Sequence, residues 1–113
     1  MKYFIILFIL LQLTTSAEKL KVCATVTDMA DLVKTIGGDE VEVITFAPAK
    51  GNTHFVVAKP NFIKDLSQAD IFIQTEFELE SGWAPVLLKS CRNANVQPNA
   101  IGHIDPANVI KPL

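Results

Sequence analysis

The two histidines of this chain are the residues best suited to chemistry. His54 follows a loop, 47–52, that contains Pro, Gly and Asn. A neutral imidazole nitrogen is a good zinc ligand, so His54 is a candidate metal ligand, although a lone histidine after a loop is more often simply solvated. His103 could form a ligand couple with Asp105, but we favour a loop or strand-edge histidine with no ligand role.

A run of acidic side chains, Glu76, Glu78 and Glu80, is a second place where a cation could bind. A hard cation needs six or more oxygen ligands that converge from a shaped loop. The alternating spacing is instead typical of a helix entry, where acidic residues favour the positive end of the helix dipole. We therefore expect these residues to begin a helix, and Trp83 to pack in the core or on the surface of the domain.

The sequence contains no recognisable catalytic group. Ser67, Ser81 and Ser90 have neither a histidine nearby in the sequence nor a nucleophile-elbow pattern. The glycines are too scattered to form a phosphate-binding loop. Cys23 and Cys91 are not in a Cys-x-x-Cys arrangement, which disfavours redox catalysis. An enzyme is therefore not expected.

The first 17 residues have the pattern of a secretory signal peptide. Lys2 precedes the apolar run 3–11, which is too short to span a bilayer because a spanning helix needs about 20 apolar residues. Small residues lead up to Ala17, so we expect cleavage after it, and an uncleaved membrane anchor is the alternative. No cysteine directly follows Ala17, which favours a soluble periplasmic form over a lipid-anchored one.

The charge and the cysteines limit the partners and the fold. Without residues 1–17 the chain has nine basic and twelve acidic side chains, and the basic ones do not cluster, so nucleic acid is not an expected partner. An oxidising compartment permits a disulfide between Cys23 and Cys91. Their predicted places, in a core strand and near a helix end, also suit buried free thiols, so both states remain open.

The hydrophobic pattern predicts alternating strands and helices. The first helix should bury the face formed by Met29, Leu32, Val33 and Ile36, with Thr27 or Asp28 at its N-cap and a Gly37-Gly38 end. The predicted strands cover 21–26, 41–46, 70–74 and 100–104, and two further helices begin at Pro60 and cover 78–90. This order predicts an α/β fold with a small, mostly parallel sheet of three to four strands flanked by helices. In such sheets ligands bind at the carboxyl ends of the strands, and the loop before His54 leaves that edge.

Taken in order, these segments resemble the solute-binding subunits of zinc and manganese ABC importers, the group of metal-binding lipoproteins and adhesins. The most similar segment has a Pro/Gly loop, a metal-binding His, an aromatic residue and a Lys-Pro helix start, here Pro48, Gly51, His54, Phe55 and Lys59-Pro60. Further similar segments are 21–39, Val41-Glu42-Val43, Ala69-Asp70, Glu78-Leu79-Glu80 ahead of Trp83, Arg92-Asn93, Gln97-Pro98 and Gly102 to Asp105. The resemblance covers residues 19 to 110.

The resemblance implies that residues 18–113 are part of the N-terminal metal-binding lobe of a two-lobed periplasmic protein. His54 matches the family's first metal ligand, and the implied cargo is zinc, or less readily manganese, delivered to an ABC permease in the inner membrane. The family usually has Asp-Pro directly before this histidine, whereas Asn52-Thr53 stands here, and the loop is shorter.

The remaining ligands of that family lie beyond Leu113, in the rest of the first lobe and in the second lobe. We therefore expect either a fragment of a longer protein or the product of a truncated gene. The alternative function is a secreted α/β lobe that binds another protein and no metal.

Overall fold

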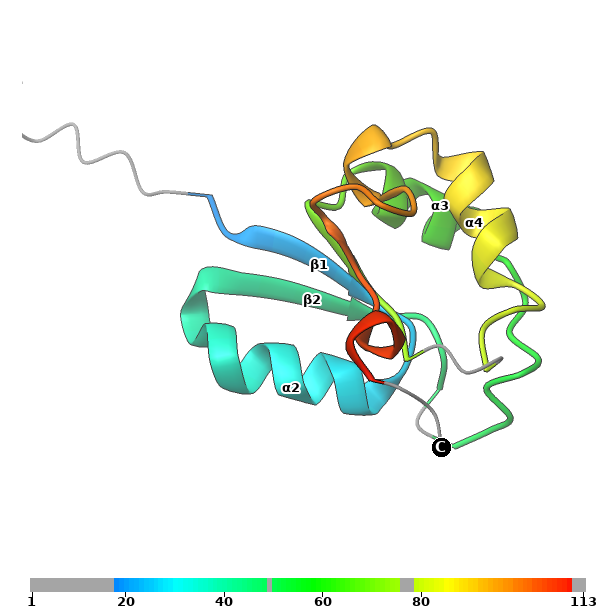
Figure 1. Cartoon of the computed structure of the whole chain (residues 1–113), viewed down its shortest axis with the longest axis horizontal. Helices are drawn as coiled ribbons and strands as arrows, with labels where there is room; N and C mark the ends of the chain where they lie inside the picture. Colours follow the sequence, from blue (N-terminus) through cyan, green and yellow to red (C-terminus); the bar gives the residue numbers. More distant parts are fainter. Residues whose placement is uncertain (1–17, 49, 76–78, 111–113) are drawn as a thin grey trace, which may run out of the picture.

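A four-stranded parallel sheet organises the part of the chain that the structure, a computed structural model, describes: residues 18–48, 50–75 and 79–110 (Figure 1). The strands lie in the order β2-β1-β3-β4, and every pairing is parallel. The elements in chain order are β1 (Leu20–Ala24), α2 (Thr27–Gly37), η1 (Gly38–Glu40), β2 (Val41–Thr45), α3 (Pro60–Ser67), β3 (Ile71–Ile73), α4 (Ala84–Cys91), η2 (Ala94–Val96), β4 (His103–Ile104) and η3 (Pro106–Val109). The predicted α/β class and its small parallel sheet are confirmed.

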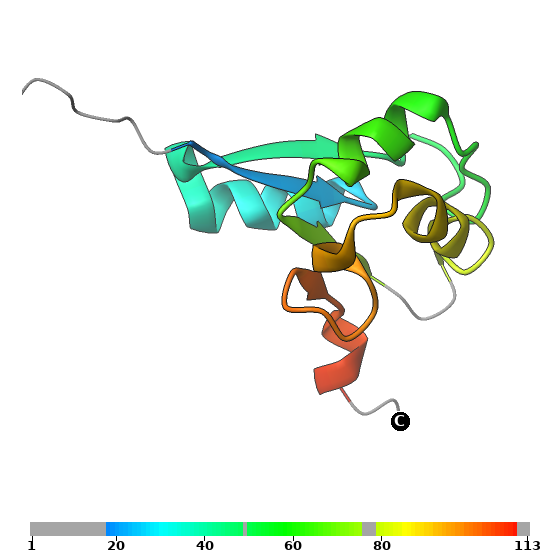
Figure 2. The same cartoon turned by 90° about the horizontal axis from the view of Figure 1, so that it is seen from above.

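Helices cover both faces of this sheet, because successive side chains of a strand point to opposite faces. Val22 and Ala24 of β1 pack with Ala30 of α2 in one core cluster. Cys23, between them, belongs to the other cluster, which includes Leu66 of α3 and Leu87 of α4. Figure 2 shows α2 on one side of the strands and α3 on the other.

The strand order creates a topological switch point at the centre of the sheet. β1 and β3 are neighbours, with Val22 opposite Ile71 and Ala24 opposite Ile73. The chain leaves β1 into α2 on one face, whereas after β3 it continues to α4 on the opposite face. Such a point leaves a crevice outside the carboxyl ends of the two strands, where ligands of open α/β sheets bind.

Helix α2 differs from its prediction at its start and in its buried face. Its N-cap is Val26, without a side-chain cap hydrogen bond, so the expected N-cap role of Thr27 or Asp28 was wrong. Met29 and Val33 do pack on the core beside Ala30, but Leu32 and Ile36 are 47% and 79% exposed. The helix turns its small residues to the sheet: a Cβ on Gly37 would lie only 2.5 Å from a Val41 methyl carbon. This close approach leaves Leu32 and Ile36 on the outer side.

The other predicted elements are present with shifted ends. Gly38 ends α2 with a φ of 52°, and its N–H donates to the carbonyl oxygen of Lys34, as the double glycine predicted. Helix α3 begins at Pro60. Proline loses no hydrogen bond there, because an N–H at the first helical position has no intrahelical acceptor. The helix predicted over 78–90 begins only at Ala84, and its first expected residue lies outside the described residues. Across 18–48, 50–75 and 79–110, no helix is long and apolar enough to cross a membrane.

Both cysteines are buried free thiols in the cluster beneath α3 and α4. Burial, together with smaller contributions from the nearby Asp65 and Cys91, raises the pKa of the Cys23 thiol to about 12. The Cys91 thiol donates to the carbonyl oxygen of Leu88 at 3.1 Å. Of the two states that the sequence left open, the structure therefore has the reduced one.

These thiols should be unreactive in the folded chain. The thiolate is the reactive species, so a raised pKa and burial should slow modification by an aromatic disulfide reagent by roughly a hundredfold or more relative to the unfolded chain. Two thiols should react once denaturant is added. No reactive thiol in denaturant would mean a disulfide, and rapid reaction of Cys23 without denaturant would contradict the packing described.

Candidate functional site

His54 lies on a turn in the segment that joins β2 to α3, near the carboxyl end of the sheet. The backbone N–H of His54 donates to the side-chain oxygen of Asn52 at 3.0 Å. The N–H of Phe55 donates to the Asn52 carbonyl oxygen, also at 3.0 Å. An Asn that bonds the backbone two residues on favours a tight turn. The turn fixes the backbone at His54 while its side chain is exposed.

A second segment of the chain holds this turn from the other side. The indole N–H of Trp83 donates to the carbonyl oxygen of Thr53 at 2.7 Å, directly before His54. Trp83 itself is only 3% exposed and belongs to the core cluster beneath α3 and α4. Of the two places expected for Trp83, the core or the surface of the domain, the structure has the core, and the hydrogen bond to the turn is an addition that the sequence did not predict.

The carboxyl group of Glu80 fills the crevice at the switch point. It is 2% exposed, and its Oε1 accepts the Thr25 hydroxyl at 2.6 Å and the Thr75 N–H at 2.8 Å. Thr25 follows β1 and Thr75 lies two residues after β3, so this one oxygen joins the ends of both central strands. The expectation that Glu80 would begin a helix was wrong, because α4 begins four residues later and the Glu80 side chain is buried at the strand ends. Glu76 and Glu78 lie outside the described residues.

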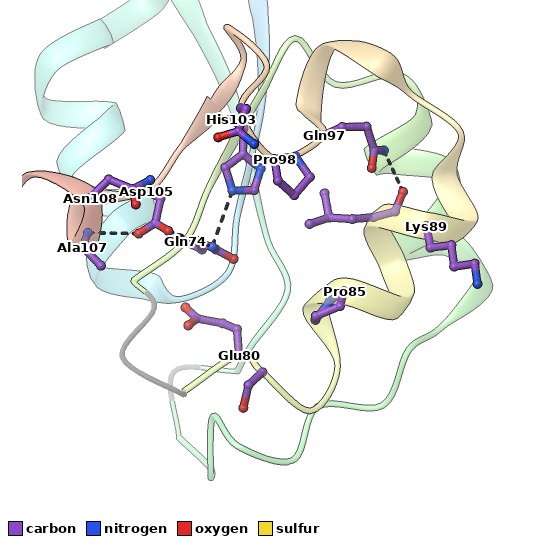
Figure 3. A pocket seen from close by; sticks show the side chains of 13 residues that line it. Gln74, Glu80, Pro85, Lys89, Gln97, Pro98, His103, Asp105, Ala107 and Asn108 are labelled. Atoms are coloured by element: carbon purple, nitrogen blue, oxygen red, sulfur yellow. Dashed lines mark hydrogen bonds between the residues drawn. The ribbon is translucent and has the colours of Figure 1, made fainter.

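A cavity of about 740 Å³ opens beside Glu80, between α4 and the segment of β4 and η3 (Figure 3). Mixed polar and apolar side chains line it: Gln74, Glu80, Ser81, Pro85, Leu88, Lys89, Gln97, Pro98, Asn99, His103, Asp105, Ala107 and Asn108. A smaller cavity of about 210 Å³ lies next to the His54 turn and is lined by Phe46, Pro48, Phe55, Val56, Val57, Lys59 and Phe62. His54 lines neither of these two cavities.

His103 begins β4 and is held in place by protein groups on both ring nitrogens. Its Nδ1 lies 2.8 Å from the carbonyl oxygen of Val96, which can only accept, so Nδ1 carries the proton. Its Nε2 is then the acceptor for the amide of Gln74, 3.5 Å away. The same amide donates to Asp105 Oδ2 at 3.3 Å, and Asp105 Oδ1 accepts the N–H of Ala107. The favoured interpretation of His103 as a strand-edge histidine agrees with this arrangement.

The structure does not bring the two histidines together. His103 lines the large cavity, whereas His54 lies on a turn that this cavity does not include. Within 18–48, 50–75 and 79–110, no group of three or more His, Cys, Asp or Glu side chains could hold a metal ion. What the described residues offer to a metal at the carboxyl edge of β2 is therefore one exposed imidazole on a fixed turn.

Comparison with known protein families identifies the family of this chain. Residues 22–111 match the family described as zinc-uptake complex component A, periplasmic. The chain belongs to this family. Its members are substrate-binding components of metal transporters and not enzymes.

Curated relatives and solved structures give the extent of the similarity. The chain is 34% identical over 85 residues to the manganese ABC transporter substrate-binding lipoprotein PsaA of Streptococcus pneumoniae, an alignment that covers 75% of this chain and 27% of PsaA. It is 30% identical over 86 residues to the iron ABC transporter substrate-binding lipoprotein MtsA of Streptococcus pyogenes serotype M1, covering 76% of this chain and 28% of MtsA. The chain thus spans a little over a quarter of the length of these relatives.

The solved structures agree with the fold. A crystal structure of ZnuA aligns with a TM-score of 0.61 at 22% identity and covers 67% of this chain and 30% of that one. The metal-dependent lipoprotein YcdH of Bacillus subtilis aligns with a TM-score of 0.57 at 29% identity, over 64% of this chain and 27% of that one. The α/β arrangement described above is therefore the one found in part of these structures.

Sequence reasoning missed the polar residues that surround the switch point. Thr25, Gln74 and Thr75 follow directly on the predicted or observed strand ends, and each makes a contact that organises the site. Polar residues directly after buried parallel strands were the available signal, because such strands end at a shared edge. Glu80, which joins Thr25 to Thr75, lies 55 residues from Thr25 and carried no such signal.

The loss of stability on substitution of Glu80 should depend on whether the new side chain keeps a hydrogen-bond acceptor. Glu80→Leu leaves the Thr25 hydroxyl and the Thr75 N–H buried without an acceptor, which should lower the free energy of unfolding by roughly 2–5 kcal/mol. Glu80→Gln retains an oxygen that can accept both bonds and should cost clearly less. Urea unfolding of the three proteins measures the difference, and equal losses for Leu and Gln would contradict the acceptor role.

Proposed function

We propose that this chain contributes the N-terminal, His54-bearing part of a metal site in an extracytoplasmic solute-binding protein that captures a transition metal for an ABC importer. The observation that carries the proposal is an exposed histidine on a backbone-fixed turn at the carboxyl edge of a parallel sheet, in a chain of the zinc-uptake family. That edge is where open α/β sheets bind ligands.

His54 suits the role of a nitrogen ligand. Its side chain is exposed, whereas the ring of His103 is engaged by the Val96 carbonyl group and by Gln74. A neutral imidazole donates a ring nitrogen lone pair to zinc, and the ring can turn about its side-chain bonds until that nitrogen faces the metal. The turn limits how far the rest of the residue has to move.

One imidazole does not complete a metal site, because zinc takes about four ligands, or three and a water. The described residues provide no cluster that would supply the others. The chain spans 27% of PsaA and 28% of MtsA, and we propose that the remaining ligands belong to the portion of such proteins that is absent from residues 18–110. The lobe described would then form one wall of the site.

Zinc is the proposed cargo, with manganese as the second candidate. An imidazole nitrogen is a ligand that suits zinc, while manganese prefers carboxylate, carbonyl and water oxygens. The family is described for zinc uptake, PsaA is named for manganese and MtsA for iron, which is the reason to test all three metals.

Residues 1–17 would direct the chain across the inner membrane, with cleavage after Ala17 and a periplasmic mature protein that delivers its metal to the permease. The sequence pattern of this segment and the periplasmic description of the family support this part of the proposal.

The proposal predicts which histidine a metal uses. In calorimetric titrations of the mature chain, zinc should bind weakly, and His54→Ala should weaken that binding by more than about tenfold, since even the loss of a residue that only supports a ligand costs that much. His103→Ala is the matched control and should leave the affinity unchanged. Parallel titrations with Mn²⁺ and Fe²⁺ rank the metals.

Three other results would count against the proposal. Binding that survives His54→Ala and is lost in His103→Ala would move the site to the large cavity. Tight binding by this chain alone would show that it holds a complete site. A complete lack of zinc binding would favour the protein-interaction function that the sequence left as the alternative.

A further inference from the structure

The turn that carries His54 is held by a segment that lies 30 residues away in the sequence. We infer that Trp83 is a positioning residue for His54, and that Glu80 anchors the segment 80–84 from which Trp83 acts. The role of Trp83 in metal binding rests on the proposed function, whereas the contacts from which it is inferred do not involve a metal.

Trp83 combines a fixed ring with a single directed hydrogen bond. The ring is 3% exposed, in the same core cluster as Phe46 and Leu87, so its position is set by packing. An indole has one N–H donor and no acceptor, and a buried one needs a partner. That partner is the carbonyl oxygen of Thr53, at 2.7 Å, in the peptide bond that links Thr53 to His54. One hydrogen bond therefore connects the packed core to the backbone at His54, the candidate metal ligand.

Gly82 places a second part of the same segment against the turn. A Cβ at Gly82 would lie 3.6 Å from the carbonyl oxygen of His54, which is ordinary van der Waals distance. The peptide before His54 is thus bonded by Trp83, and the peptide after it runs close to Gly82. Together with the bond from the His54 N–H to Asn52, the backbone on both sides of His54 is restrained.

Glu80 fixes the segment that makes these contacts. Its backbone carbonyl oxygen accepts the N–H of Trp83 at 3.1 Å and that of Ala84 at 2.9 Å, which closes the first turn leading into α4. Its side chain is bonded to Thr25 and Thr75 at the ends of β1 and β3. A continuous set of contacts therefore runs from the switch point of the sheet, through Glu80 and Trp83, to the peptide of His54.

This arrangement fixes the position from which an exposed side chain is presented. The His54 side chain is exposed and its ring can turn, but the place and direction of its Cα–Cβ bond are set by the restrained backbone. A ligand whose backbone is fixed before the metal arrives loses less conformational freedom on binding, and supporting contacts of this kind determine affinity in metal sites. Trp83 would act on the metal through His54 and would not touch it.

The test removes the indole N–H while keeping the ring. Trp83 is the only tryptophan, so its replacement by benzothienylalanine, which has sulfur in place of N–H and nearly the same shape, changes one donor only. Trp83→Phe is the genetically encoded second variant. Val96→Ala is the matched control, because Val96 is fully buried in the same core cluster and its apolar side chain has no hydrogen-bond donor to lose. Amide hydrogen exchange at His54 and Phe55, and zinc affinity, are measured for each.

If the inference holds, losing the indole N–H speeds exchange at His54 and Phe55 by about tenfold, the effect of one hydrogen bond, and leaves the amides of Thr25 and Phe46 unchanged. Zinc affinity should fall by roughly tenfold in the same variants and stay constant in Val96→Ala. Equal exchange in the Trp83 variants and in Val96→Ala would overturn the positioning role. If the unsubstituted chain binds no zinc through His54, the proposed function fails, and the exchange data still decide whether Trp83 holds the turn.

Discussion

A buried carboxyl group between the ends of the two central strands is the constraint on which the rest of this structure depends. Where the connections after two neighbouring parallel strands leave on opposite faces, hydrogen-bonding groups remain at the strand ends, and buried groups of this kind need partners. Glu80 Oε1 accepts from Thr25 after β1 and from Thr75 after β3. Glu80 thereby fixes the start of the segment 80–84, which carries Trp83 into the core before α4 begins at Ala84.

The path of this segment separates two regions of the carboxyl edge. On one side lies the His54 turn, tied through Thr53 to the indole of Trp83. On the other side lies the cavity of about 740 Å³, where His103 and Asp105 share the amide of Gln74. The two histidines therefore differ in kind: the ring of His103 is part of the packed structure, whereas the exposed ring of His54 suits an external ligand.

The sequence was sufficient for the sheet and for the location of His54, because both depend on local patterns. Alternating apolar strands, a Pro-initiated helix and the Gly37-Gly38 end are signals carried by neighbouring residues. It was insufficient for α2's buried face, because the rotation of the helix on the sheet is set by the packing of Met29, Ala30 and Val33 against the strands, which is a tertiary effect. It also misassigned Glu80, since a carboxyl group that bonds Thr25, 55 positions away, has no local signature and is easily mistaken for a helix-entry acid.

The most direct test of the account is a zinc titration of the chain with ¹⁵N-labelled imidazole rings, followed by nuclear magnetic resonance, with Mg²⁺ as the control cation. The chain has only two histidines, so the spectra of His54→Ala and His103→Ala assign both rings. Zinc should shift the signal of a ring nitrogen of His54 while His103 keeps its Nδ1-protonated form, and Mg²⁺ should shift neither ring. A zinc-induced shift at His103 with His54 unchanged would contradict this prediction.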